Sequence, residues 1–359
     1  MYNIIMRPGR ENSSTLLHRL VPLPALLMLL AALSLRVAAR TLPGFADRYA
    51  EYCNPILVNT LGRLSALLPC SLAELLLLAS LPLALLLLWR RRLLRALLYL
   101  LPALFLLFEL NEDIYFSRTG FASAYQLERG DYSDEELYGV CRELVAEINQ
   151  YAGLVPRNAD GMMQTEEALP ARMCSAMQAL GQDYPCLSGW YPRPKAVLCS
   201  SALSRMDLTG IYSIFTIEAN YNRDMPPYNI PFTIAHELSH LKGIMSEKEA
   251  NFIGYLACRR APEPDLRYSA AMLGWIYCGN ELARRNAALW RRAASTLDIR
   301  AEQDLRYNSA FWKTYEGRIS ETAQTLNDRY LKAEGLSEGT RSYELVVDLI
   351  VSYELRNTP

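Results

Sequence analysis

The sequence predicts an α+β protein in which N-terminal transmembrane helices precede a mostly helical domain with a small sheet. Two observations lead to this fold class. Apolar residues, above all leucine, are concentrated before residue 111, and the rest of the chain has the composition of a globular domain. In that second part, short strand-like stretches are followed by a long series of segments with the apolar spacing of helices. We therefore expect a membrane region over residues 1–114 and a second domain over residues 115–359.

The overall composition argues against two classes of protein. The chain has 359 residues, of which 51% are hydrophobic and 21% are charged, and its formal net charge is −1. So high an apolar fraction excludes intrinsic disorder, and the near-neutral charge argues against a nucleic-acid partner. The composition leaves the oligomeric state open.

Three apolar segments predict membrane-spanning helices near residues 20–39, 67–89 and 93–110, since a span requires about 20 apolar residues. More than half of the residues between Leu67 and Leu110 are leucine, which leaves no polar face for a soluble helix to present to water. The first segment could instead be a cleaved signal peptide, with Val37-Ala38-Ala39 as the cleavage site. Arg36 and the prolines of this segment favour a retained helix.

The basic residues predict the orientation of the membrane region. Arginines occupy positions 90–92 and 95 between the second and third segments, and Arg7, Arg10 and Arg19 precede the first segment. Both groups should face the cytoplasm by the positive-inside rule. We therefore expect a multi-pass protein of the cell membrane, with the connection 41–66 and the second domain on the extracytoplasmic side.

The cysteines are consistent with this location but select no disulfides. Six of the eight cysteines lie in the second domain, and an oxidising compartment would permit them to pair. The sequence does not choose among the pairings, and buried free thiols remain the alternative.

The second domain is expected to begin with helices. Ser133 and Glu136 form a capping-box pattern that opens a helix ending near Tyr151, and a second helix is expected over 165–180. Residues 196–199 and 211–221 predict two short strands, because they are rich in β-branched, aromatic and other apolar residues. After residue 227 the apolar spacing predicts helices over 231–242, 247–259, 265–286, 305–316, 321–333 and 343–355.

The motif with the clearest chemistry is His236-Glu237-Leu238-Ser239-His240, in the expected helix 231–242. Residues four apart share one face of a helix, so the two imidazoles converge. This spacing suits Zn²⁺, and Glu237 lies beside the ligands, where it can take a proton from a metal-bound water that attacks a carbonyl. The chain has three histidines in all, and the presence of two of them in this motif favours a metal site over ordinary core packing.

A catalytic zinc site requires a third protein ligand, and the second domain contains no further histidine, so we expect a carboxylate. Two candidates, Glu247 and Glu249, follow a turn at Gly243. Ser246 resembles a helix N-cap, which would make Glu249 its partner in a capping box. Glu247 instead shares a helix face with Asn251. We therefore favour Glu247 as the ligand, with Asn251 as a polar group beside it, and a structural role for Glu249.

The run TIAHELSH…SEKEANFIGYLAC resembles the gluzincin metallopeptidases, in which a Glu followed four residues later by Asp or Asn supplies the third ligand. This resemblance implies a zincin-like second domain, with Glu247 as ligand and Asn251 as its partner. Over nearly its whole length the chain more closely resembles a bacterial family of membrane proteins, domain-of-unknown-function family 3810. The leucine-rich N-terminal helices, the GIYSIFTIEAN segment and the tail NDRYLKAEGLSEGTRSYELVVDLI carry this likeness.

The sequence thus predicts a membrane-anchored zinc metalloendopeptidase of gluzincin type, which hydrolyses peptide bonds by a metal-activated water with Glu237 as general base. The alternative is a catalytically inactive zinc-binding membrane sensor or scaffold. Cleavage within the bilayer is disfavoured, because the residues that flank the motif are too polar for a membrane span. The expected partners are a peptide or protein substrate and the lipid bilayer.

Two further parts of the site remain open in the sequence. The strand expected within residues 210–222, with Glu218 and Asn220 at its polar end, would bind the substrate backbone by strand addition or serve as an ordinary strand. The group that stabilises the oxyanion is expected among tyrosines, arginines and backbone amides. The candidate tyrosines are Tyr255, Tyr307 and Tyr315.

Overall fold

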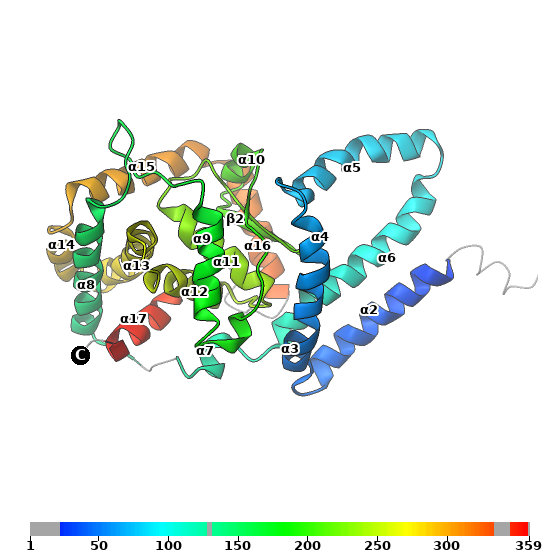
Figure 1. The fold of residues 1–359 in the computed structure, drawn as a ribbon, viewed down its shortest axis with the longest axis horizontal. Coiled ribbons are helices and arrows are strands. Elements are labelled where there is room, and N and C mark those ends of the chain that lie inside the picture. Colours follow the sequence, from blue (N-terminus) through cyan, green and yellow to red (C-terminus); the bar gives the residue numbers. More distant parts are fainter. Residues whose placement is uncertain (1–21, 128–130, 334–344, 358–359) are drawn as a thin grey trace, which may run out of the picture.

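The computed structural model describes residues 22–127, 131–333 and 345–357, and these residues form a mostly helical protein with one small sheet (Figure 1). Three long apolar helices project from one side of a larger helical body. The α+β class expected from the sequence is confirmed at this level, with a membrane-type N-terminal part and a mostly helical second part.

The three apolar segments form helices α2 (Leu23–Thr41), α5 (Leu72–Trp89) and α6 (Leu93–Asn111), as expected. Each is long and apolar enough to cross a membrane. Helices α5 and α6 form a hairpin, and Arg90 and Arg91 lie in the turn between them. In Figure 1 this turn is at the end of the hairpin that is remote from the helical body. Arg7, Arg10 and Arg19 lie outside the described residues.

Ionic contacts join α2 to the C-terminal end of α6. The Arg36 guanidinium lies 2.8 Å from a Glu109 carboxylate oxygen and 3.0 Å from an Asp113 oxygen. The Arg40 guanidinium lies 3.1 Å from the same Asp113 oxygen. Because Glu109 and Asp113 are buried, these contacts compensate charges that would otherwise be costly in an apolar environment.

The connection expected as a loop over 41–66 is instead helical. It forms α3 (Phe45–Leu57), the π-helical segment η1 (Val58–Gly62) and the short helix α4 (Arg63–Ser65). Val58 belongs to the main hydrophobic core, and the Asn54 amide donates a hydrogen bond to the Leu241 carbonyl at 3.1 Å. This part of the expected membrane region therefore packs into the body of the protein.

The body begins with short elements and then follows the expected helices closely. The expected capping box of Ser133 and Glu136 is present at the start of α8 (Asp134–Ala152). The helix expected over 165–180 is shorter, α9 (Leu169–Leu180). The later helices are α11 (Asn229–Leu241), α12 (Glu247–Arg259), α13 (Pro264–Arg285), α15 (Ile299–Tyr315), α16 (Arg318–Ala333) and α17 (Val346–Asn357).

Several short helices are not among those expected, and most of them are too short to show apolar periodicity. These are η2 (Asp113–Ser117), α7 (Phe121–Ala124), η3 (Pro185–Leu187), α10 (Ser200–Arg205) and α14 (Ala287–Ala294).

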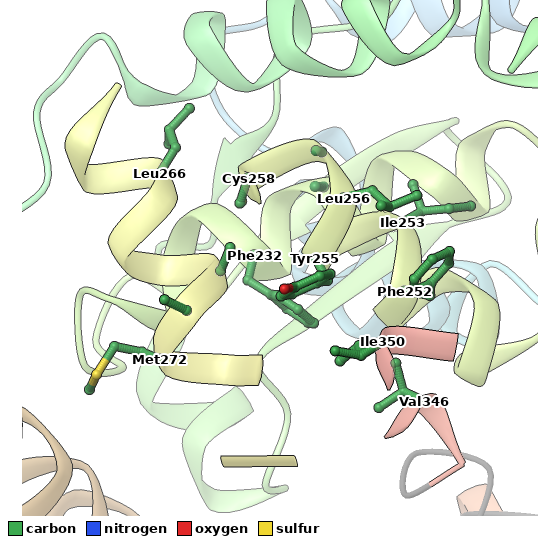
Figure 2. Close-up of a cluster of buried hydrophobic side chains, with 14 of the residues drawn as sticks. Phe232, Phe252, Ile253, Tyr255, Leu256, Cys258, Leu266, Met272, Val346 and Ile350 are labelled. Carbon is green, nitrogen blue, oxygen red and sulfur yellow. The ribbon is translucent and has the colours of Figure 1, made fainter. Parts of the chain in front are cut away.

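The core of the body lies between α11, α12, α13 and α17. Figure 2 shows Phe232 of α11, Phe252 and Tyr255 of α12, and Ile350 of α17 in this buried cluster. Gly254 permits the close packing of α11 and α12, because a Cβ at this position would lie 3.0 Å from the Phe232 carbonyl oxygen. This packing fixes the two helices that carry the candidate site.

In the described part of the chain the sheet has three strands, β1 (Lys195–Ala196), β2 (Gly210–Ser213) and β3 (Glu218–Tyr221), in the order β1-β3-β2. β1 is parallel to β3, and β2 is antiparallel to it. The single strand expected over 211–221 is therefore wrong, because the chain reverses after Ser213. Ile217 adopts a left-handed conformation in this turn, with φ of 52°, which few residues other than glycine favour.

The cysteines do not form disulfides. All eight thiols are free, and Cys141, Cys258 and Cys278 are buried. The alternative of buried thiols thus describes these three, and no disulfide contributes to the fold.

Candidate metal centre

Helix α11 presents His236, Glu237 and His240, and its close packing on α12 and α13 buries most of its surface. The two imidazoles lie on one face, with their Nε2 atoms 2.9 Å apart. The helix ends at Leu241, and Gly243, two residues later, has φ of 76° and occupies the left-handed conformation common just after helix C-termini. This tight turn returns the chain to α12, whose first residue is Glu247.

The turn brings the Glu247 carboxylate to the two imidazoles. Its Oε2 lies 3.2 Å from His236 Nε2 and 3.8 Å from His240 Nε2. Tetrahedral ligands around zinc, with bonds of about 2.0–2.1 Å, lie about 3.3 Å from one another. The measured separations bracket that value. Two imidazole nitrogens and one carboxylate oxygen also form a donor set that suits zinc, so these three residues could hold a metal ion.

The other ring nitrogen of each histidine is held by an oxygen acceptor. His236 Nδ1 lies 2.9 Å from the Asn251 side-chain oxygen, and His240 Nδ1 lies 2.6 Å from the Ile244 carbonyl. Since these oxygens can only accept, each Nδ1 donates, and the Nε2 lone pairs of the neutral rings face one another. The two Nε2 atoms are 2.9 Å apart, so their lone pairs repel unless a proton or a cation lies between them. Histidines whose Nδ1 is held by an oxygen acceptor, with Nε2 left to bind, are typical of metal sites.

Burial affects the two imidazoles differently because of their neighbours. Burial lowers the pKa of His236, but the hydrogen bond and the charge of Glu247 outweigh it and raise the pKa to about 9. At His240 burial prevails over the attraction of Glu247 and lowers the pKa to about 4. A cation bound by these residues would therefore have to displace a proton from His236.

Glu237 is buried next to strand β2 rather than among the ligands. A Cβ at Gly210 would lie 2.6 Å from Glu237 Oε1, so the absence of a side chain at Gly210 makes room for this carboxylate. Burial raises the pKa of Glu237 to about 8, against the opposing effects of His236 and of a hydrogen bond with the Tyr212 backbone. Its carboxyl group is thus fixed between the ligand helix and the edge of the sheet.

Glu249 has a structural contact, but not the one that the sequence suggested. Ser246 precedes α12 without a side-chain capping bond, so the expected capping box does not form. Glu249 Oε1 instead accepts a hydrogen bond from the Ala122 backbone amide at 2.8 Å, in the first turn of α7. Gly120 permits this approach, because a Cβ there would lie 2.8 Å from the same oxygen.

A large cavity, with a volume of about 1260 Å³, opens in front of this cluster. His236, Glu237, His240 and Glu247 lie on its wall, and so do the residues of strand β2. The antiparallel pairing leaves one edge of β2 facing this space, since β3 occupies the other edge. Of the polar residues expected at the end of the strand, Asn220 lines the cavity. Glu218 is buried in an ion pair with Lys195.

The three tyrosines proposed for oxyanion stabilisation do not line this cavity. The Tyr255 hydroxyl is buried and donates to Glu354 at 2.6 Å, whereas Tyr307 and Tyr315 pack against the Phe311 ring. Among the described residues, the tyrosines on the cavity wall are Tyr212, Tyr277 and Tyr330. Their positions depend on how β2, α13 and α16 pack together, and no local sequence pattern distinguishes them from the other tyrosines.

Comparison with known proteins identifies the family of the chain. Neither the curated proteins nor the solved structures gave a match. The model of one family matches residues 49–351, which include the apolar helices α5 and α6, the sheet and the candidate metal centre. The chain therefore belongs to the family described as protein of unknown function (DUF3810).

Proposed function

We propose that the protein is a membrane-anchored, zinc-dependent metallopeptidase with a gluzincin-type site in a zincin-like domain. The convergence of His236, His240 and Glu247 beside the buried Glu237, on the wall of one large cavity, carries this proposal. A purely structural zinc site has no use for a buried carboxylate next to an open space. For this reason we favour a peptidase over an inactive sensor or scaffold.

The proposed role of Glu237 is proton transfer. Zinc, when bound, would lower the pKa of a coordinated water and polarise the substrate carbonyl. Glu237 would accept a proton from the attacking water on its carboxylate and then donate that proton to the leaving amine. His236 and His240 would hold the ion, with their ring orientation fixed by Asn251 and by the Ile244 carbonyl.

Strand β2 is the proposed binding site for the substrate backbone. The Asn222 backbone amide donates to the Thr209 carbonyl at 2.8 Å. Along a strand of an antiparallel pair, successive residues direct their backbone groups alternately toward the partner strand and away from it. This alternation directs the backbone groups of Gly210 and Tyr212 away from β3, toward the cavity. An extended peptide could therefore pair with this edge and lie next to Glu237.

We place the helical body on the extracytoplasmic side of the cell membrane. The arginine-rich turn between α5 and α6 lies at the far end of the hairpin from the body (Figure 1). If that turn is cytoplasmic, as the positive-inside rule favours, the body lies across the bilayer from it.

The variant Glu237→Gln tests the proposed chemistry. In the full chain purified in detergent, this variant should retain zinc and lose hydrolysis of a randomised peptide library by about 10²- to 10⁴-fold, since proton transfer contributes factors of that size. Zinc content is measured by atomic emission, and cleavage by mass spectrometry. Glu249→Gln is the matched control, because its remaining side-chain oxygen can still accept from Ala122. Unchanged hydrolysis by Glu237→Gln would show that the assignment is wrong.

A further inference from the structure

The cavity at the candidate metal centre extends to the first turns of the membrane-type helix α5. Its wall includes Ala73, Glu74, Leu77 and Leu78 in addition to the metal-centre residues. Leu77 and Leu78 are 73% and 57% exposed. They belong to an apolar helix in which Glu74, in the first turn, is the buried residue. One side of the cavity is therefore formed by a surface that would face lipid in a bilayer.

The sheet is held against the start of this helix by two reciprocal caps. The Glu218 carboxylate accepts hydrogen bonds from the Leu72 amide at 3.1 Å and the Ala73 amide at 2.9 Å. In return, the Glu74 carboxylate accepts from the Leu198 amide at 2.8 Å and the Cys199 amide at 2.7 Å. Carboxylates at helix N-termini are favourable because the first amides of a helix have no partner within it. These four bonds fix the sheet, and the segment that leads from β1 into α10, at the level where α5 begins.

The edge strand consequently leads from the metal centre toward the start of α5. Gly210, at one end of β2, contacts Glu237, and Ser213, at the other end, pairs with Glu218, whose side chain caps α5. The next residues expose apolar surface, since Phe215 in the turn is 43% exposed. The path along β2 from the candidate catalytic base to the residue that pairs with Glu218, the cap of α5, is thus three residues of β-strand, or about 10 Å at roughly 3.3 Å per residue.

We infer that the substrate is a polypeptide anchored in the same bilayer, and that its juxtamembrane segment is the part that binds along β2. This inference rests on the proposed peptidase function and specifies its substrate class. A chain paired with β2 would leave the cavity beside Leu77 and enter the lipid there. The bond next to Glu237 would then lie about three to six residues from the membrane end of the anchor, given the length of β2. A strand edge favours a polypeptide over a lipid, because a lipid has no repeating amide groups to pair with it.

The test uses two matched pools of substrates and the full chain, loaded with zinc and reconstituted in phosphatidylcholine vesicles. One pool carries randomised twelve-residue segments joined to a leucine-rich transmembrane helix, and the other carries the same segments without the helix. Cleavage sites and rates are read by mass spectrometry. We expect the anchored pool to be cleaved at least about 100-fold faster, with sites clustered about three to six residues from the anchor. Insertion of a ten-residue Gly-Ser spacer next to the anchor should move cleavage into the spacer.

Substitutions in α5 separate this entry path from a general effect of the membrane. Leu77→Trp, which adds bulk at the cavity wall, should slow cleavage of the anchored pool at least about fivefold. Leu81→Trp is the matched control, because Leu81 lies one turn further along α5, is 67% exposed and does not line the cavity. Equal effects of the two variants would overturn the entry path.

The outcomes distinguish this inference from the function on which it rests. Equal cleavage of both pools, lost in Glu237→Gln, would support the peptidase and overturn the anchored substrate. Absence of Glu237-dependent cleavage in both pools would overturn both proposals. Glu237-dependent hydrolysis of the vesicle phospholipid, without peptide cleavage, would assign the cavity to a lipid and likewise overturn both.

Discussion

Replacement of Asn251 by alanine should weaken zinc binding by about 10- to 100-fold. His236 Nδ1 and the Asn251 side-chain oxygen are 2.9 Å apart, and Asn251 is buried on α12. The corresponding acceptor for His240 is the Ile244 backbone carbonyl, which a side-chain substitution does not remove. Substitution of Asn251 therefore changes the orientation of the His236 ring while His236 itself stays in place.

The magnitude follows from what the substitution removes. Without its acceptor, the His236 ring can rotate or adopt the other tautomer, so part of its lone-pair alignment is lost before the metal binds. A loss of 10- to 100-fold corresponds to about 1.4–2.8 kcal/mol. Asn251→Asp retains an acceptor and adds negative charge near the site, so its zinc affinity should equal or exceed that of the wild type.

The assay is a competition titration of zinc against a chromophoric chelator, with the full chain in detergent and circular dichroism as the check of folding. Asn229→Ala is a matched control, because Asn229 is also a buried asparagine on the cavity wall, but its amide donates to Asn308 at 2.8 Å. Its zinc affinity should change less than about twofold. If Asn251→Ala folds normally and binds zinc as tightly as this control, Asn251 does not orient a ligand and the metal-centre geometry is refuted.

Three other predictions follow from the site and its support. Zinc affinity should fall about tenfold for each pH unit below 9, because the metal must displace the proton of His236, whose pKa is raised to about 9. Zinc titrations over a pH series check this, and an affinity that does not change with pH would contradict it. Gly210→Ala should lower kcat/KM more than about tenfold at unchanged zinc content, because the new Cβ would lie 2.6 Å from Glu237 Oε1. Unaltered kinetics would show that the Glu237 carboxylate does not lie beside Gly210 during catalysis. Tyr255→Phe should lower the free energy of unfolding by about 1–3 kcal/mol, since it removes the hydrogen bond to the buried Glu354. It should leave kcat unchanged. Denaturation in detergent measures the first effect, and steady-state kinetics measure the second.

The helix that carries His236 and His240 was predictable because its chemistry is local. A four-residue spacing places both imidazoles on one face whatever the surrounding fold is. The preference for Glu247 over Glu249 came from the same kind of argument, and the structure places Glu247 at the histidines. The reason given for Glu249 was wrong, because Glu249 binds the amide of Ala122, which is remote in sequence and reachable only through the tertiary fold.

Other features of the site could not be read from the sequence for physical reasons. The turn between β2 and β3 contains no glycine, proline or asparagine, so the usual turn signals are absent and a single strand was expected. The acceptor for His240 is the main-chain carbonyl of Ile244, to which any residue type would contribute equally. The tyrosines on the cavity wall are selected by helix packing, and their sequence surroundings carry no signal of it.

The reciprocal caps that Glu74 and Glu218 form with the facing amides determine what proteolytic removal of the membrane helices would do to the body. Lys195 is buried beside Glu218 and also donates to the Ser65 carbonyl at 2.7 Å. Removal of everything before residue 115 would strip this ion pair of the Ser65 carbonyl and the α5 amides at once, and would expose it to water. The sheet edge and the first turn of α5 thus depend on one another for the partners of their buried polar groups. Proteolytic shedding of the body from its membrane helices should therefore inactivate the protein rather than release a working soluble form.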